Sequence, residues 1–451
     1  MTTIRQRWKI WTSKSTNYRI FGAASIVGSA TGVVYIVHAA KELTVGAHFG
    51  TTDAMDAYLL AYLLPSYCIN MIAGPVSSAL IPAFIHLREK EGFRTSLSLL
   101  AGANLWGGVL LLCVTIVLIG CGSSVLPLLA SDFAPDKLAL TQSIFYCLLP
   151  LIVLQGMANI WGSILNAFER FALAAAAPCM PSLITLAFLF FGPGSWAIYN
   201  LVWGALTGTL LQLVLLFGNA VRLKIVVRPL NHPALVKVAR EYWPVVAGAA
   251  LMAGTTVIDQ AMAATLSPGS LASLAYGDRV VAGILGVGTM ALGTAVLPHF
   301  SRLAAVEKWA DLAHTFKVYN RLIWLYSFLL TSVFLSFSEP IVRLFWERGA
   351  FTPVDTQLVS QIQACYALRM PFYMVGIIVV RLLSSLRANR FLFFISGINL
   401  VLNVIFNVIF MKWWGVTGLA LSTSAVYVIS YFMLSHTLKA CWPGHDRASI
   451  D

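Results

Sequence analysis

The sequence has little charge. Only 11% of its 451 residues are Asp, Glu, Lys or Arg, whereas about a quarter are charged in an average soluble domain. Hydrophobic residues make up 59% of the chain, and the mean hydropathy is +0.80. This balance excludes a soluble globular protein and indicates a chain that crosses a lipid bilayer many times. The net charge of +12 fits the basic cytoplasmic loops of membrane proteins, so we expect no nucleic-acid partner.

Several chemical motifs are also missing. The seven cysteines form no CxxC pair and no cluster with histidine, so the sequence supports neither a disulfide framework nor a metal site. No Walker A loop is present, which argues against ATP hydrolysis, and we expect no cofactor. The basic start MTTIRQRWKIWTSKSTNYRI lacks a small-residue cleavage site after a short apolar core. It therefore predicts a retained cytoplasmic tail rather than a signal peptide.

Long apolar segments are what the sequence has in abundance. A spanning helix needs about 20 mostly apolar residues, and the sequence contains twelve such segments. They lie near residues 20–48, 53–86, 95–121, 138–168, 170–192, 194–220, 241–267, 270–302, 315–338, 355–386, 390–412 and 415–439.

The basic residues support this count. With the N-terminus inside, all but eight of the 30 Lys and Arg fall in cytoplasmic segments. Those eight are the outward Lys137, Arg343, Arg348 and Lys412, and the membrane-embedded Lys41, Arg279, Arg369 and Arg381. Because cytoplasmic loops are enriched in Lys and Arg, the pattern predicts that both termini are cytoplasmic. The outward connections are short and leave no room for a catalytic domain, so we do not expect an enzyme.

The two halves of the chain resemble each other. Four matches occur in order and at a nearly constant offset: LIPAFIHL at 80–87 with VLPHFSRL at 296–303, DFAPD at 132–136 with AFTPVD at 350–355, Pro150 with Pro371, and Arg170-Phe171 with Arg390-Phe391. Six spans per half is an even number, so both halves enter the membrane in the same orientation and form a parallel repeat.

This repeat predicts an all-α polytopic membrane protein, with about 12 transmembrane helices in two parallel-repeat six-helix lobes around a central cavity. The architecture is typical of transporters that work by alternating access. The predicted parts are a basic cytoplasmic tail (1–19), an N-terminal lobe (20–220), a cytoplasmic linker (221–240), a C-terminal lobe (241–440) and a cytoplasmic C-terminal tail (441–451).

Six ionisable residues lie at one predicted depth, in the outer third of four spans. They are Lys41, Glu42, Asp56, Asp259, Asp278 and Arg279. A charge in hydrocarbon costs a few kcal/mol or more, so such residues usually face a hydrated cavity or a partner. Asp278 and Arg279 are adjacent on a helix and point about 100° apart, so they cannot satisfy each other.

We predict that Arg279 and Lys41 line a hydrated cavity and bind an anionic headgroup, since a guanidinium matches the oxygens of a phosphate. Arg369, nearer the middle of its span, is a third candidate for this cationic site. Asp278, Asp259, Glu42 and Asp56 are predicted counter-ions or coupling residues. The alternative is that these charges form interhelical ion pairs that only hold the helices together.

Asn399, Asn403 and Asn407 are spaced four residues apart in the eleventh predicted span. This spacing places them on one face of a helix. Amide side chains in membrane helices most often bond to a neighbouring helix, and we expect that role here.

On these residues the chain resembles the MurJ/MviN family, the lipid II flippases of the multidrug/oligosaccharidyl-lipid/polysaccharide (MOP) exporter superfamily. The resemblance covers nearly the whole chain. It rests on KELTVGAHFGTTDAMDAYLLAYLLP at 41–65, ALIPAFIHLREKEG at 79–92, ILNAFERFALAAAAP at 164–178, LAYGDRVVAGILGVG at 274–288, ALGTAVLPHFSR at 291–302 and LFWERGAFTPVDT at 344–356.

The resemblance implies translocation of an undecaprenyl-pyrophosphate-linked glycan from the inner to the outer leaflet of the bacterial inner (cytoplasmic) membrane. It also implies a cationic cavity, with Asp278-Arg279, Lys41-Glu42 and Asp56 at the family's charged positions. Four other positions that are charged in the family are uncharged here: Tyr35, Ile69, Gly74 and Ala282. Twelve spans are also two fewer than in typical members. These departures leave lipid II and a related exopolysaccharide or O-antigen unit equally open as substrates.

Three other functions are weighed against this one. A cation-coupled multidrug exporter of the same superfamily would have a mainly acidic cavity, against which the embedded cations argue. A membrane enzyme of polysaccharide synthesis would need a large outward loop. A scaffold for cell-wall or polysaccharide synthesis enzymes, which are candidate partners besides the bilayer and the lipid-linked glycan, would not need Arg279 and Lys41.

Overall fold

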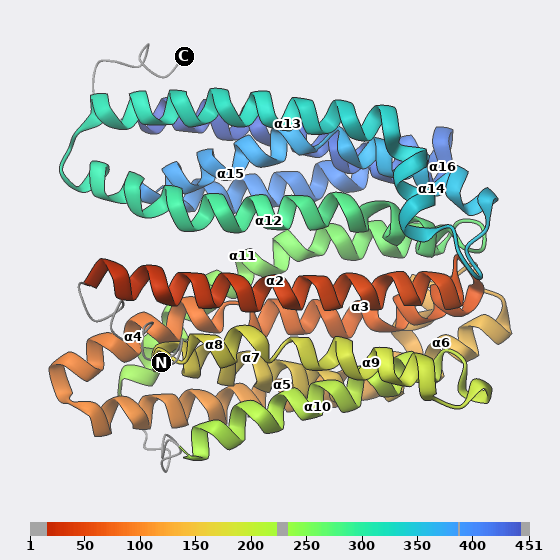
Figure 1. The fold of residues 1–451 in the computed structure, drawn as a ribbon, viewed down its shortest axis with the longest axis horizontal. Helices are drawn as coiled ribbons and strands as arrows, with labels where there is room; N and C mark the ends of the chain where they lie inside the picture. The colour runs from red at the N-terminus through yellow and green to blue at the C-terminus, as the bar shows by residue number, and fades with distance from the viewer. Residues whose placement is uncertain (1–15, 223–232, 387, 443–451) are drawn as a thin grey trace, which may run out of the picture. The chain divides into compact units, whose positions relative to one another are not determined.

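The computed structural model describes residues 16–222, 233–386 and 388–442. Most of the predicted N-terminal tail, the middle of the predicted linker and nearly all of the predicted C-terminal tail lie outside the described residues. Within the described ranges the chain consists of α-helices and one short 3-10 helix, without β-strands (Figure 1). The predicted all-α class is therefore confirmed.

Helices cover every predicted span. In chain order they are α2 (Thr16–Phe49), α3 (Asp53–Ala73), α4 (Val76–Glu91), α5 (Phe93–Leu129), α6 (Pro135–Leu148), α7 (Pro150–Ala167), α8 (Phe171–Ala176), α9 (Cys179–Phe191), the 3-10 helix η1 (Gly194–Trp196), α10 (Tyr199–Arg222), α11 (Pro233–Ala264), α12 (Ser270–Ala305), α13 (Trp309–Trp346), α14 (Pro353–Ala367), α15 (Met370–Ser385) and α16 (Asn389–Cys441).

Nine helical segments among the described residues are long and apolar enough to cross a membrane. Some of them consist of two helices in succession, such as α6 with α7 and α14 with α15. The last segment contains both the eleventh and the twelfth predicted span. These are separated within α16 at Gly415, whose φ of 56° and ψ of −134° are not helical. The first two predicted spans correspond to α2 and to α3 with α4.

The internal repeat has structural counterparts. Pro135 begins α6 and Pro353 begins α14, positions that suit proline because the first helical residue needs no backbone N–H donor. The matched Phe84 and Phe300 are both fully buried. Equivalent residues of the two halves therefore have the same local roles.

The described residues group into two compact units. Unit 1 consists of the residues up to Val45 together with Ala61–Leu126 and Ala139–Ala250. Unit 2 consists of Gly46–Leu60, Pro127–Leu138 and the residues from Leu251 onward. Two short segments of the first half of the chain thus belong with the second half. The lobe boundaries predicted from the sequence do not anticipate this exchange, and they stay a prediction.

In unit 1, α10 packs against α7 and α9, and α4 packs against α7 (Figure 1). The contact of α9 with α10 depends on Gly204 and Gly208, which are four residues apart. A Cβ on either glycine would lie 2.6 Å from a backbone Cα atom of α9, that of Thr185 or Pro181. Small residues at this spacing allow two membrane helices to approach closely.

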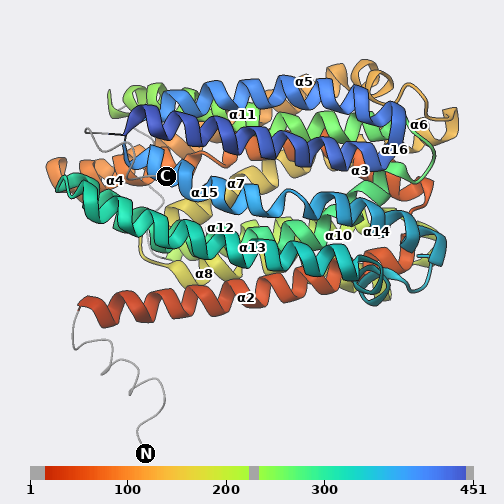
Figure 2. The same cartoon turned by 90° about the horizontal axis from the view of Figure 1, so that it is seen from above.

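In unit 2, α12 packs against α14 and α15, which also contact α13 and α16 (Figure 2). Hydroxyl groups connect these helices. Ser338 of α13 donates to the backbone carbonyl of Ser360 in α14 at 2.7 Å, and both residues are buried. Such bonds satisfy polar groups that could not find water inside a bilayer.

The turn after α13 approaches the end of α2, and the residue of closest approach is Gly349. Its φ is +62°, and an added Cβ would lie 2.1 Å from the carbonyl oxygen of Ala47. That same oxygen accepts a hydrogen bond from the backbone N–H of Ala350 at 2.8 Å. The contact therefore requires glycine for both its backbone conformation and its lack of a side chain.

We expect Gly349→Ala to lower the free energy of unfolding by about 2–4 kcal/mol, because it combines an unfavourable φ with an overpacked contact. Thermal unfolding in detergent measures the effect. Gly218→Ala in α10 is the matched control, since a Cβ there meets nothing within 4 Å and alanine favours a helix. Equal stability of the two variants would contradict the close contact.

Candidate substrate and coupling sites

The predicted site residues are divided between the two units. Lys41 and Glu42 belong to unit 1, whereas Asp56, Asp259, Asp278, Arg279 and Arg369 belong to unit 2. Each group is described by itself.

Lys41 and Glu42 lie next to each other in α2 and form an ion pair. The Lys41 Nζ is 2.5 Å from a carboxylate oxygen of Glu42, which is buried, while 19% of the Lys41 side chain is exposed. His38, one turn earlier, places its Nε2 3.6 Å from the same oxygen and its Nδ1 3.4 Å from the hydroxyl of Ser182 in α9. The predicted counter-ion Glu42 is thus in contact with the predicted cation.

Asp278 of α12 makes an ion pair with Arg369. The pair is asymmetric, because 37% of the Asp278 side chain is exposed but only 10% of the Arg369 side chain. Arg279 is partly exposed.

Two tyrosine rings lie beside Arg369. Its guanidinium carbon lies 4.5 Å from the ring centre of Tyr366 and 5.9 Å from that of Tyr427. Rings at this distance stabilise a cation through their electron-rich faces. The sequence predicts Arg369 as a third headgroup cation, and this stays a prediction; in the structure Arg369 is buried and paired with Asp278.

Asp259 of α11 is held by three side chains of α16. One carboxylate oxygen accepts from the amides of Asn403 at 2.9 Å and Asn407 at 2.7 Å. The other accepts from the hydroxyl of Thr423 at 3.0 Å. The hydroxyl of Ser422 in turn donates to Asn407. All these residues are buried.

The asparagine stripe therefore bonds between helices, as expected, and Asn399 also does so within α16 by donating to Ser430 across the kink at 2.9 Å. The bonds from Asn403 and Asn407 to Asp259 were not anticipated from the sequence. The available signal was the regular spacing of the amides near a lone carboxylate of similar depth. No group of three or more His, Cys, Asp or Glu that could hold a metal occurs in the described part of the chain.

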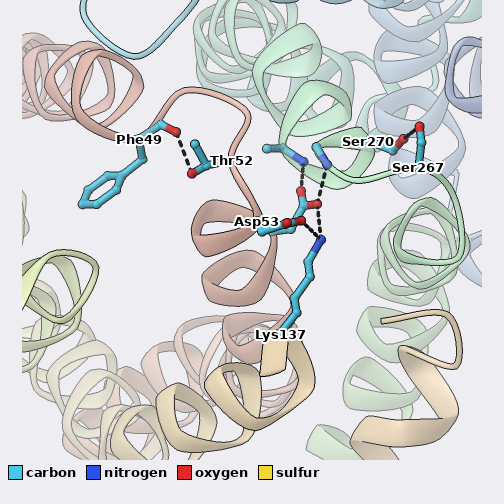
Figure 3. Close-up of polar contacts among 9 residues, drawn as sticks. Phe49, Thr52, Asp53, Lys137, Ser267 and Ser270 are labelled. Atoms are coloured by element: carbon cyan, nitrogen blue, oxygen red, sulfur yellow. Dashed lines mark hydrogen bonds and ion pairs between the residues drawn. The ribbon is translucent and has the colours of Figure 1, made fainter. Parts of the chain in front are cut away.

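Asp56 of α3 caps the beginning of α12. Its carboxylate accepts from the backbone N–H groups of Gly269 at 2.7 Å and Ala272 at 2.8 Å. The Nζ of Lys137 lies 2.8 Å from the same carboxylate and 2.6 Å from Asp53 (Figure 3). The first N–H groups of a helix have no partner within the helix, and its dipole favours a negative charge there.

Asp56 stays a predicted counter-ion or coupling residue of the cavity. Its cation is Lys137, which the sequence placed in an outward connection and not in the site. Lys137 also lies 4.1 Å from the ring centre of Phe133. No sequence pattern could show this partnership, because Asp56 and Lys137 are 81 residues apart.

A further contact of unit 2 joins the turn between α2 and α3 to the beginning of α14. The Thr51 hydroxyl donates to Asp355, which itself completes a capping box with Thr352 at the start of α14. Three residues near the junction of α2 and α3 therefore bond to the second half of the chain: Ala47, Thr51 and Asp56. They explain why Gly46–Leu60 belongs to unit 2.

An all-helical chain with many spans, an internal repeat and charged side chains inside its membrane segments defines a multi-pass membrane transporter. Comparison with known proteins identifies which kind. The family described as "Lipid II flippase MurJ" matches residues 45–450. The chain belongs to this MurJ family.

Relatives in other bacteria agree with this assignment. The "Probable lipid II flippase MurJ" of Synechocystis is 26% identical over 90% of this chain and 79% of the relative. The protein of the same description from Rhizobium meliloti is 27% identical over 93% of this chain and 80% of the relative.

Solved structures show the same fold. "Lipid II flippase MurJ, inward closed conformation" superposes with a TM-score of 0.78 at 21% identity, covering 92% of this chain and 87% of the other. An inward-facing multidrug resistance MATE family transporter of the MOP superfamily superposes with a TM-score of 0.74 at 11% identity, covering 93% and 98%. At these identities the likeness concerns the fold alone.

Proposed function

We propose that the protein translocates an undecaprenyl-pyrophosphate-linked glycan from the inner to the outer leaflet of the bacterial inner membrane by alternating access, with both termini in the cytoplasm. Lipid II and a related exopolysaccharide or O-antigen unit are the candidate cargoes. The single observation that carries this proposal is the match of the lipid II flippase family to residues 45–450.

Arg279 and Lys41 are the proposed ligands of the pyrophosphate. Both are partly exposed. Asp278, next to Arg279, pairs with Arg369, whereas Glu42 pairs with Lys41 itself. The fork of donors on a guanidinium matches two phosphate oxygens, and Lys41 adds a compact charge. The flanking carboxylates Asp278 and Glu42 limit the local excess of positive charge, so that the headgroup is bound and can also be released.

Asp56 and its partners are proposed to stabilise one state of the transport cycle. The bonds from Gly269, Ala272 and Lys137 hold α3 against the beginning of α12. An alternating-access cycle makes such contacts in one state and breaks them in another. Asp259 is the proposed coupling residue, since a buried carboxylate among amide and hydroxyl groups is a place to bind a proton or a hard cation.

Arg279→Gln is expected to reduce flipping in proteoliposomes at least tenfold, because the amide cannot supply the charged bidentate contact. The assay compares lipid II with an undecaprenyl-pyrophosphate exopolysaccharide unit, and the faster cargo identifies the substrate. Arg343→Gln is the control, since it removes an equal charge from an exposed ion pair of α13. Undiminished flipping by Arg279→Gln combined with Lys41→Gln would contradict the proposed site, and no flipping of either lipid by the unmodified chain would favour a scaffold.

A further inference from the structure

The membrane helix α7 has a narrow row of polar residues that the packing of unit 1 leaves partly open. The row consists of Gln155, Asn159, Gly162 and Asn166, and we call it the α7 polar row. Steps of three and four residues place all its members on one face of the helix. All four are partly exposed. A Cβ on Gly162 would meet nothing within 4 Å, so there is open space in front of the row.

The surroundings of the α7 polar row differ from those of a lipid-facing surface. Buried residues flank the row, with Leu151 and Ala158 on one side and Ile152 and Ser163 on the other. The opposite side of the helix is also partly exposed, but it is entirely apolar: Val153, Leu154 and Met157. Polar side chains of membrane helices face partners or water, because hydrocarbon offers them no hydrogen bonds. The row therefore faces water or a polar ligand.

The amides of the row do not join α7 to another helix. Gln155 Nε2 donates to Asn159 Oδ1 at 3.0 Å, one turn away in the same helix. Among residues 16–222, 233–386 and 388–442, this is the one hydrogen bond of either amide group. Amides in membrane helices most often bond to a neighbouring helix, as Asn403 and Asn407 do. The N–H groups of Asn159 and the carbonyl oxygen of Gln155 remain available to a ligand.

The internal repeat shows that the fold does not require these amides. The matched prolines of the repeat lie at the beginnings of α7 and α15. Five and nine residues after its proline, α7 has Gln155 and Asn159, whereas α15 has Gly376 and Val380. The equivalent helix of the second half therefore forms with a glycine and an aliphatic residue at these positions. This difference favours a role in binding for the two amides of the first half.

We infer that the α7 polar row is a binding subsite for the sugars of the lipid-linked glycan. The inference rests on the proposed function and names where the uncharged part of its cargo binds. A carboxamide has both donors and an acceptor, so it can bond to neighbouring hydroxyls of a sugar or to the amide of an N-acetyl group. The row itself has no charge, and it therefore suits sugars better than the pyrophosphate.

The depth of the row agrees with this assignment. In the proposed orientation α7 runs toward the cytoplasm, so the row extends from the middle of the membrane to its cytoplasmic side. Lys41, a proposed ligand of the pyrophosphate, lies in the outer third of its span. A lipid-linked glycan of the inner leaflet has its sugars on the cytoplasmic side of its pyrophosphate. The order of the two subsites along the membrane normal thus matches the order of the two chemical groups.

The test measures binding to the full chain in nanodiscs. The probes are lipid II, an undecaprenyl-pyrophosphate exopolysaccharide unit, and undecaprenyl pyrophosphate, which has no sugar. Replacing both Gln155 and Asn159 with leucine is expected to weaken binding of the glycan lipid that the unmodified chain prefers about tenfold, which corresponds to one or two net hydrogen bonds. Binding of undecaprenyl pyrophosphate should stay within about twofold. Gln357→Leu, which removes an exposed amide of α14, is the control and should change neither.

A second variant fills the space in front of the row and removes no hydrogen bond. Gly162→Leu is expected to weaken binding of the preferred glycan lipid at least about fivefold, because its side chain occupies the volume of a sugar. Gly120→Leu in α5 is the matched control, since a Cβ there also meets nothing within 4 Å and its exposed neighbours are apolar. If the double leucine variant does not fold, as judged by thermal unfolding in detergent, Gly162→Leu decides the question.

The outcomes separate the sugar subsite from the proposed function. Equal weakening of all probes by the row variants, or unchanged binding of the glycan lipids, overturns the subsite. Arg279→Gln should weaken every probe, including undecaprenyl pyrophosphate. If it weakens none while the row variants weaken only the glycan lipids, the proposed headgroup site is wrong and the subsite stands. If the unmodified chain binds neither glycan lipid, both the proposed function and the subsite are overturned.

Discussion

Replacing Asp56 with alanine is expected to lower the free energy of unfolding by about 3–5 kcal/mol, the cost of breaking a buried ion pair by removing one partner. Asp56 is 2% exposed and accepts from Lys137 and from two N–H groups at the start of α12. The substitution leaves the two backbone N–H groups without their acceptor, and it leaves Lys137 with only the exposed Asp53 as a carboxylate partner. It also removes the negative charge that the helix dipole favours.

Asp53 provides the matched control, because it bonds to the same lysine from an exposed position. Its side chain is 59% exposed, and its oxygen lies 2.6 Å from Lys137 Nζ. Asp53→Asn should change stability by less than about 1 kcal/mol, as exposed ion pairs contribute little. Thermal or denaturant unfolding in detergent compares the two. Similar losses from both variants would mean that burial does not determine the strength of this contact.

The charge pair can be tested further by removing both partners. Lys137→Met added to Asp56→Asn is expected to restore part of the stability lost by Asp56→Asn alone, since no buried charge is left unpaired. An additive loss would show that the two side chains stabilise the fold independently.

Replacing Asp259 with leucine is expected to cost about 2–4 kcal/mol. The substitution leaves the donors of Asn403, Asn407 and Thr423 without an acceptor in a buried position. Each unsatisfied buried donor costs about 1–3 kcal/mol, although single hydrogen bonds between membrane helices average nearer about 0.6 kcal/mol. Unfolding in detergent measures the loss.

Asn399→Leu is the control on the same helix stripe. Asn399 donates one hydrogen bond to Ser430 and is only partly buried, so its loss should cost about 1 kcal/mol or less. If Asp259→Leu lowered the free energy of unfolding no more than Asn399→Leu, the Asp259 carboxylate would not organise α16. It would then also be a weak candidate for coupling.

The charges inside the membrane segments have distinct roles. Asp56 holds a helix terminus, Arg369 holds Asp278, and Asp259 holds the polar face of α16. Lys41 and Arg279 remain the residues proposed to meet a phosphate. Interhelical ion pairs, the alternative considered for all of these charges, are present for Asp56 and Asp278. Lys41 and Arg279 are partly exposed.

The sequence predicted the fold well where the signal is local. Twelve apolar segments were expected, and helices occupy all of them. The repeat was visible in short matches, because Pro135 and Pro353 begin helices by the same local rule. The family resemblance, quoted on motifs such as LFWERGAFTPVDT, was confirmed by the match over residues 45–450.

The sequence could not predict which residues pair. Thr423 is 164 residues from Asp259, and Arg369 is 91 residues from Asp278. Placing charges at one depth uses only their position along each span, whereas pairing also depends on helix rotation and packing. The exchange of Gly46–Leu60 into unit 2 was missed for the same reason, since it depends on contacts such as that of Asp56 with Gly269.

A helical membrane protein of repeated halves with a few embedded charges can be recognised from the amino-acid sequence alone. Hydropathy, charge and helix-starting prolines act within a few turns of chain, so their consequences are readable there. The partner of each charge and the division between the two units depend instead on how the helices pack. A buried carboxylate must find donors within about 3 Å, and only packing brings distant helices that close.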